Sequence, residues 1–324
     1  MTTPFACSAS ARASADLPLA VGPAISASGS LEGASVFIAT LIAAERLTRG
    51  DICAARDALG GSPEPEWVEA DRACDFLMAG DPRLARQALE GLIPGIDVIV
   101  QPKAGRRKRL LVADMDSTMI GQECIDELAD YVGRKAEVAA VTEAAMRGEL
   151  DFAAALDARV ALLEGLDDAM IDRCREERMR VTPGARTLVR TMAAQGAHSV
   201  LVSGGFTRFA GPVAAEIGFA EVRANVLGIA GEKLTGLVAK PIVDAEAKKQ
   251  ALIDAAVERG IPLCETLAVG DGANDIPMVR AAGLGVAYHA KPALAAAADA
   301  RIEANDLTAL LFAQGYGRND WIED

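Results

Sequence analysis

Two aspartates, Asp114 and Asp116, carry the clearest chemical signal in the sequence. They follow the apolar run Leu110–Ala113, which is typical of a strand buried on both faces of a parallel sheet. Two carboxylates this close resist joint ionisation unless a cation lies between them or one holds a proton. The pattern therefore indicates either a metal-bound carboxylate pair or a nucleophile beside an acid. A turn after a strand, where Asp, Ser and Thr are also common, is the competing interpretation.

Three further stretches could serve the same chemistry. Leu201–Gly205 has the pattern of a strand that ends in Ser203 and two glycines, where backbone N–H groups can approach an anion closely. Lys248 lies near the start of a predicted helix, and a third apolar run, 267–269, leads into the turn Gly270–Asp275. Ligands of an open α/β sheet bind at the carboxyl ends of its strands. Together these groups could support phosphoryl transfer.

These four motifs, in this order, resemble those of the haloacid dehalogenase-like phosphatases, and within that superfamily they are most similar to its phosphoserine phosphatases. The resemblance covers about residues 108–312. It implies an α/β fold, a doubly wound parallel sheet with an inserted small helical cap, over residues 110–324. It also implies Mg²⁺ as cofactor and the small molecule O-phospho-L-serine as substrate. The expected reaction releases L-serine and phosphate through an aspartyl-phosphate, as the last step of serine biosynthesis.

Chemistry and resemblance together give each matched position an expected role. Asp114 is the expected nucleophile, and Asp116 is the expected general acid and base, which requires a pKa near the working pH. The expected Mg²⁺ ligands are the Asp114 and Asp271 carboxylates and the main-chain carbonyl of Asp116. Four further positions are expected to contact the substrate, namely Ser203, Gly204, Lys248 and Asn274. Asp275 is expected to lie behind the metal ligands and to orient metal-bound water and the lysine.

Between the first two motifs, residues 121–181 have a helical pattern broken at glycines. The expected helices are Cys124–Val132, Lys135–Met146, Phe152–Leu163 and Asp168–Arg178. The segment is similar to the four-helix cap that covers the active site in the family. By that resemblance Glu123 meets the substrate ammonium, Phe152 forms a wall and Arg159 binds the substrate carboxylate. The alternative for Glu123 is a structural role in the first turn of a helix, where its charge interacts favourably with the helix dipole. The alternative for Arg159 is an ordinary surface arginine on a helix.

Residues 31–102 are predicted to form a small α+β domain ahead of the phosphatase body. The expected order is βαββαβ, a ferredoxin-like arrangement similar to the ACT-like domains found in bacterial relatives. Its elements are expected at Val36–Ala43, Gly50–Leu59, Trp67–Met78 with a break near Asp71, Pro82–Leu92 capped by Asp81, and Asp97–Gln101. Amino-acid sensing or homodimer formation is one interpretation of this domain. A packing module without a ligand is the other.

The remaining core elements are expected after the cap. They are a helix from Thr182 to Gln195, a strand at 198–202, a β-hairpin over 224–238, a helix at 276–282, a strand at 284–287 and a helix at 307–314.

Composition and net charge limit the classes of binding partner and the cellular compartment that are expected for this protein. The formal net charge of -13 disfavours nucleic acid and anionic membranes as partners. The basic run 103–109 is therefore interpreted as a solvated linker rather than a nucleic-acid patch. Six scattered cysteines without a Cys-x-x-Cys pair indicate reduced thiols in a cytoplasmic protein. Residues 1–30, rich in Ala and Ser, are expected to be flexible, and no apolar run is long enough for a membrane-spanning helix.

Three other functions are compatible with these motifs. In a phosphotransferase, an alcohol such as homoserine would resolve the aspartyl-phosphate in place of water. In another small-molecule phosphatase with this cap, Glu123 and Arg159 would be dispensable. In an amino-acid-binding regulatory protein, the N-terminal domain would carry the function and the phosphatase body would be inactive.

Overall fold

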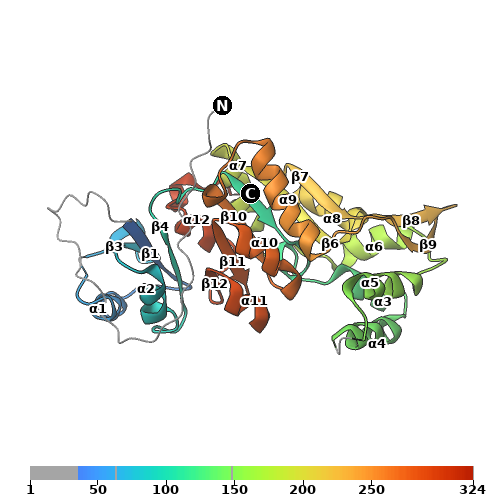
Figure 1. Ribbon diagram of the computed structural model, residues 1–324, viewed down its shortest axis with the longest axis horizontal. Helices are drawn as coiled ribbons and strands as arrows, with labels where there is room; N and C mark the ends of the chain where they lie inside the picture. The colour runs from blue at the N-terminus through green and yellow to red at the C-terminus, as the bar shows by residue number, and fades with distance from the viewer. Residues whose placement is uncertain (1–35, 63, 147–148, 324) are drawn as a thin grey trace.

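The computed structural model describes residues 36–62, 64–146 and 149–323. The prediction of a flexible segment at 1–30 lies outside these residues. Figure 1 shows an elongated molecule with a small N-terminal domain at one end, a central α/β body and a helical cap at the other end. Within the described residues, no helix combines the length and apolarity needed to cross a membrane.

The N-terminal domain has the predicted βαββαβ order. Its four strands form an antiparallel sheet in the order β2-β3-β1-β4, which is the ferredoxin-like arrangement. Asp81 caps the second helix through the Arg83 N–H, as expected, but that helix ends at Leu89 rather than Leu92. The elements are β1 Val36–Ala43, α1 Arg49–Ala58, β2 Glu66–Glu69, β3 Ala73–Ala79, α2 Pro82–Leu89 and β4 Ile96–Pro102.

The central body contains a six-stranded parallel sheet in the order β12-β11-β10-β5-β6-β7. Strand β5 lies inside the sheet, and all four of its residues are fully buried. Because every strand runs in the same direction, the ends of β5, β6 and β10 meet at one edge. The strands are β5 Leu110–Ala113, β6 His198–Phe206, β7 Glu221–Asn225, β10 Thr266–Gly270, β11 Leu284–Tyr288 and β12 Ala300–Ile302.

Helices cover both faces of this sheet, which confirms the doubly wound fold. Alternate residues of β5 enter two separate apolar cores, because successive side chains of a strand point to opposite faces. Leu111 packs in the core with α7, α8 and α12, and Leu110 packs in the core with α9, α10 and α11. The helices are α7 Ala185–Ala194, α8 Thr207–Ile217, α9 Ala245–Glu258, α10 Ile276–Ala281, α11 Pro292–Ala297 and α12 Ala309–Ala313.

The cap contains the four predicted helices. Its entry and exit are joined where Ile120 pairs with Val181, close to the predicted limits of 121 and 181. The β8-β9 hairpin also belongs to this end of the molecule, since the Gly165 N–H donates to the Leu234 carbonyl. The elements are α3 Cys124–Tyr131, α4 Lys135–Met146, α5 Phe152–Ala161, α6 Ala169–Arg178, β8 Leu227–Ala230 and β9 Lys233–Val238.

The prediction of a solvated linker at 103–109 is wrong for two of its basic residues. Arg106 forms a salt bridge with Asp75 of the N-terminal sheet at 2.6 Å and donates to the carbonyls of Phe312 and Ala313. Lys108 is only 3% exposed and donates to the Cys264 carbonyl. A count of charges along the chain cannot reveal these partners, because they lie far away in the sequence.

Candidate active site

Asp114 and Asp116 occupy the turn at the end of β5. The Asp114 N–H donates to the Val269 carbonyl of β10, which fixes the start of the turn against the neighbouring strand. Met115 is fully buried in the core, as expected for the residue between two site-facing aspartates. Ser117 then adopts a left-handed backbone, with φ of 53°, and reverses the chain toward the cap.

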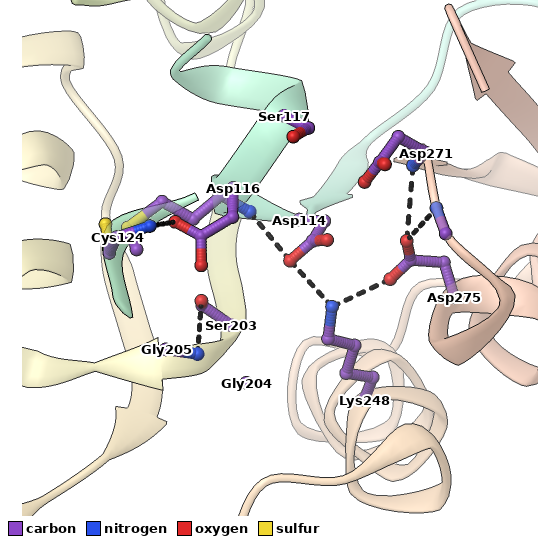
Figure 2. Close-up of polar contacts among 12 residues, drawn as sticks. Asp114, Asp116, Ser117, Cys124, Ser203, Gly204, Gly205, Lys248, Asp271 and Asp275 are labelled. Atoms are coloured by element: carbon purple, nitrogen blue, oxygen red, sulfur yellow. Dashed lines mark hydrogen bonds and ion pairs between the residues drawn. The ribbon is translucent and has the colours of Figure 1, made fainter. Parts of the chain in front are cut away.

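Lys248 joins the first and fourth motifs through two ion pairs. Its ammonium lies 2.6 Å from Asp114 Oδ1 and 2.8 Å from Asp275 Oδ1, and its side chain is 1% exposed (Figure 2). Burial raises the pKa of Asp114, the charge of Asp275 adds to this, and Lys248 opposes both. The lysine is therefore the internal cation that keeps two buried carboxylates compatible with each other.

Asp116 has the properties of a group that exchanges protons near neutral pH. Burial, followed by the charge of Glu123, raises its pKa to about 7. The Cys124 N–H donates to its Oδ1 at 3.3 Å and partly opposes this shift. At neutral pH such a carboxyl is present in both protonation states, which is what a general acid that later acts as a base requires.

The second motif lies beside Asp116 and depends on its glycines. A Cβ at position 205 would lie 3.0 Å from Asp116 Oδ2 and from Ser203 Oγ, and a Cβ at 204 would lie 3.2 Å from Phe152 Cζ of the cap. Ser203 Oγ accepts from the Gly205 N–H at 2.8 Å, so its own proton remains available to donate. Figure 2 shows the Ser203 hydroxyl directed toward the Asp116 side chain.

Asn225, which the sequence analysis did not select, supports this motif from behind. Its Nδ2 donates to the Gly204 carbonyl at 2.8 Å, and its Oδ1 accepts from the Val243 N–H at 2.7 Å. The side chain is 2% exposed, so both bonds are shielded from water. Asn225 thus ties the Ser203–Gly204 turn to the segment that leads into α9. A lone asparagine within the predicted hairpin region offered no signal of this role.

The fourth motif supplies hard oxygen ligands for a metal. One carboxylate oxygen from each of Asp114, Asp271 and Asp275 lies within 4.8 Å of the others, and all three residues are buried. Both Asp275 oxygens are already bonded, one to Lys248 and the other to the N–H groups of Asp271 and Gly272. Asp114 and Asp271 are therefore better placed than Asp275 to bind directly. An all-carboxylate set of this kind fits Mg²⁺.

One cavity of about 350 Å³ lies between this strand edge and the cap. Eight of the predicted site residues line it, namely Asp114, Asp116, Glu123, Phe152, Arg159, Gly204, Asp271 and Asn274. Ser203, Lys248 and Asp275 lie behind this lining. Residues that the sequence analysis did not select also line it, namely Ile125, Thr142, Leu156, Gly205, Phe206 and Lys291.

The cap contributes two opposite charges to the cavity. Ser117 Oγ donates to Glu123 Oε1 at 2.8 Å, which leaves the second Glu123 oxygen available to a ligand. Arg159 is anchored by its Nε, which donates to the Ala155 carbonyl one turn earlier in α5. Burial lowers the pKa of Arg159, while the charges of Asp126, Glu123 and Asp116 raise it. An arginine keeps its positive charge under these conditions.

A comparison with models of known protein families gives a match that spans all four motifs. The model of the haloacid dehalogenase-like hydrolases matches residues 111–280, which include all four motifs. The chain belongs to this family. A phosphoserine phosphatase of Albidiferax ferrireducens is 48% identical over 208 residues, which are 63% of this chain and 88% of that protein. A phosphoserine phosphatase of Streptomyces coelicolor is 43% identical over 253 residues, 76% of this chain and 62% of that protein.

Solved structures of the family agree with this assignment. A probable phosphoserine phosphatase from Vibrio cholerae, in its unliganded form, superposes with a TM-score of 0.71 at 31% identity and covers 88% of each chain. The chain spans 62% and 55% of the lengths of the phosphoserine phosphatases of S. coelicolor and Mycobacterium tuberculosis, respectively. Those two relatives therefore contain sequence that this family member does not match.

Proposed function

We propose that this protein is a Mg²⁺-dependent phosphoserine phosphatase. The observation that supports this most strongly is the composition of one cavity. At its base lie the carboxylates suited to phosphoryl transfer, and at its cap side lie one arginine and one glutamate. Phosphoserine needs such a set, since it carries a phosphate, a carboxylate and an ammonium. The names of the relatives found at 43–48% identity agree with this substrate.

The proposed reaction proceeds in two displacements at Asp114. Its carboxylate attacks phosphorus, the bond from phosphorus to the serine oxygen breaks, and protonated Asp116 donates a proton to that oxygen. In the second step Asp116 takes a proton from water, which attacks the aspartyl-phosphate, releases phosphate and restores Asp114. The pKa of about 7 for Asp116 supports both of its roles.

The other residues hold the substrate during these steps. Arg159 binds the substrate carboxylate, and the free oxygen of Glu123 binds the ammonium. The Ser203 hydroxyl and the backbone N–H at Gly204 donate to phosphate oxygens. A Mg²⁺ held by the Asp114 and Asp271 carboxylates and the Asp116 main-chain carbonyl would offset the repulsion between nucleophile and phosphate dianion. A cytoplasmic location and the last step of serine biosynthesis are the setting that this proposal implies.

Phosphate release from a panel of phosphomonoesters tests the substrate assignment. The panel is O-phospho-L-serine, phosphoethanolamine, which lacks the carboxylate, and p-nitrophenyl phosphate, each with Mg²⁺ or with EDTA. We expect kcat/KM to be highest for phosphoserine and activity to disappear in EDTA. Equal rates for the three esters would contradict the substrate assignment. Phosphate transfer to added homoserine in preference to water would identify a phosphotransferase instead.

Arg159→Ala tests the carboxylate contact within that panel. Loss of a bidentate charge-assisted contact should lower kcat/KM for phosphoserine by about 100-fold. The same variant should change kcat/KM for phosphoethanolamine by less than about threefold, since that ester has no carboxylate to lose. An equal loss on both esters would assign Arg159 to the structure of the cap rather than to the substrate.

A further inference from the structure

Lys291 brings a second cation to the metal-binding edge of the cavity. It follows β11 and is the residue before α11, on a part of the chain that no phosphatase motif includes. Its backbone is fixed, because its N–H donates to the Asp271 carbonyl at 2.9 Å and its carbonyl accepts from Leu294 and Ala295. Its side chain is 67% exposed and ends 3.4 Å from Asp271 Oδ2. The backbone of Lys291 is therefore anchored, while its largely exposed side chain is held at its end by the ion pair with Asp271.

The charges that line the cavity indicate a role for the Lys291 side chain. Four carboxylates line the cavity, and the cationic side chains in its lining, within the described residues, are Arg159 and Lys291. Lys248 lies behind the lining, with its ammonium held by two aspartates. Arg159 projects from the cap, and Lys291 lies beside Asp271 at the base of the cavity. Asp271 offers a carboxylate oxygen within 4.8 Å of one from Asp114, so Lys291 lies next to the edge at which a phosphate dianion would meet the nucleophile.

The ion pair between Asp271 and Lys291 keeps its full strength only while no metal ion is bound to the Asp271 carboxylate. The Lys291 ammonium faces Asp271 and also feels the charges of Glu123 and Asp114, which raise its pKa against the opposing effect of burial. A divalent cation on the Asp271 carboxylate would weaken the ion pair, because it neutralises the carboxylate and repels the ammonium. A flexible four-carbon arm could then turn toward another anion in the same cavity.

We propose that Lys291 is a phosphate-positioning residue that is held by Asp271 in the metal-free enzyme and is released to the phosphate when a divalent cation binds Asp271. This inference rests on the proposed function. It predicts that the contribution of Lys291 to phosphate binding depends on the metal. It also distinguishes Lys291 from Lys248, whose two ion pairs are internal to the site.

Calorimetric titration with inorganic phosphate, in the presence of Mg²⁺ or EDTA, tests this coupling without turnover. With Mg²⁺, Lys291→Met should weaken phosphate binding about tenfold, the size expected for one charge-assisted hydrogen bond. In EDTA the same substitution should change the affinity by less than about twofold. Lys291→Arg should recover most of the loss with Mg²⁺. Lys249→Met, which removes a partly exposed lysine on α9 paired with Glu246, is the matched control and should change nothing.

Each outcome bears on a distinct claim. If the wild-type protein with Mg²⁺ does not bind phosphate, the proposed function fails and the role of Lys291 fails with it. If the wild-type protein binds phosphate and Lys291→Met binds it equally well, only the role of Lys291 is overturned. An equal loss with and without Mg²⁺ would overturn the release step, since Lys291 would then contact phosphate regardless of the metal.

Discussion

Asp116 illustrates how one side chain is prepared by its immediate neighbours. Burial would raise the pKa of any carboxyl here, and the negative charge of Glu123 raises it further, to about 7. The same Glu123 is the proposed ligand of the substrate ammonium. Under the proposed mechanism, the residue that binds the substrate therefore also raises the proton affinity of the residue that acts as acid and base.

This coupling predicts the pH dependence of the reaction. In the wild-type protein kcat/KM should fall on the alkaline side of about pH 7, because the proton that Asp116 donates is lost. In Glu123→Gln a negative charge is removed, so the pKa of Asp116 falls and the alkaline limb moves to lower pH. The pH profile of phosphoserine hydrolysis measures this. A limb that stays in place or moves to higher pH would show that Glu123 does not act on Asp116.

Among the elements, the turn between β6 and α8 depends on a residue from β7. Asn225→Ala would leave the Gly204 carbonyl and the Val243 N–H without their buried partner. We expect the free energy of unfolding to fall by about 2–6 kcal/mol, from about 1–3 kcal/mol for each of the two unpaired groups. We expect kcat/KM to fall about tenfold, because the turn that carries Ser203 and Gly204, the proposed phosphate contacts, loses its support.

Urea denaturation and steady-state kinetics of the same preparation test both expectations. Asn319→Ala is the matched control, because Asn319 is an exposed asparagine and its loss should change stability by less than about 0.5 kcal/mol. If Asn225→Ala had the stability and activity of this control, the bonds to Gly204 and Val243 would not support the turn.

Elements with a clear apolar pattern could be predicted, and those with a short or interrupted pattern could not. Strands β5, β6 and β10 were predicted because each is a short apolar run that stops at a polar cluster. Helix α8 was missed because Gly211 and Pro212 interrupt its pattern, and β12 was missed because it has three residues. The predicted hairpin began at residue 224, but residues 224 and 225 belong to β7, which pairs with β6 in the main sheet.

Within the site, the predicted residues were those in a recognisable motif, together with three cap residues that match the family's substrate contacts. The two aspartates of the first motif and the glycine-rich turn of the fourth have a fixed spacing that suggests their chemistry. Asn225 and Lys291 have no such spacing, since their partners are brought to them by the pairing of neighbouring parallel strands. Their importance depends on tertiary contacts alone, so the sequence analysis did not find them.

At the scale of the whole molecule, the N-terminal domain is joined to the α/β body by buried polar contacts. Asp97 of β4 accepts from the backbone N–H groups of Glu303, Ala304 and Asn305 and from Asn305 Nδ2. Arg106 connects Asp75 to the carbonyls at the end of α12. These contacts make the described residues 36–62 and 64–102 a part of the folded body rather than a domain on a solvated tether. Its ACT-like character and a role in homodimer formation stay predictions.

Arg106→Met tests this junction. It would leave the Asp75 carboxylate buried without its cation, and we expect the free energy of unfolding to fall by about 3 kcal/mol at neutral pH. Burial already raises the pKa of Asp75 and Arg106 opposes this, so removal of the arginine raises it further. The folded variant then binds a proton more readily than the unfolded chain, and its stability is lost as the pH rises.

The loss in free energy of unfolding caused by Arg106→Met should therefore be smaller near pH 5 than near pH 8, as measured by urea denaturation. Lys103→Met is the control, because Lys103 is exposed in the same segment. A deficit that matches this control, or one that grows as the pH falls, would contradict the proposed burial of Asp75 against Arg106.

The central claim is that Asp114 becomes covalently phosphorylated during turnover. Rapid acid quenching of the enzyme with phosphoserine that carries radiolabelled phosphorus, in Mg²⁺, tests it most directly. A second quenched sample is reduced with borohydride, which releases the phosphate and leaves homoserine at the modified aspartate, and is then analysed by peptide mass spectrometry. The mechanism predicts an acid-stable radiolabel on the unreduced protein and homoserine at position 114 in the reduced sample. Both should be absent from Asp114→Asn and should form more slowly in Asp116→Asn. Turnover without a radiolabelled protein, or a label that persists in Asp114→Asn, would contradict it.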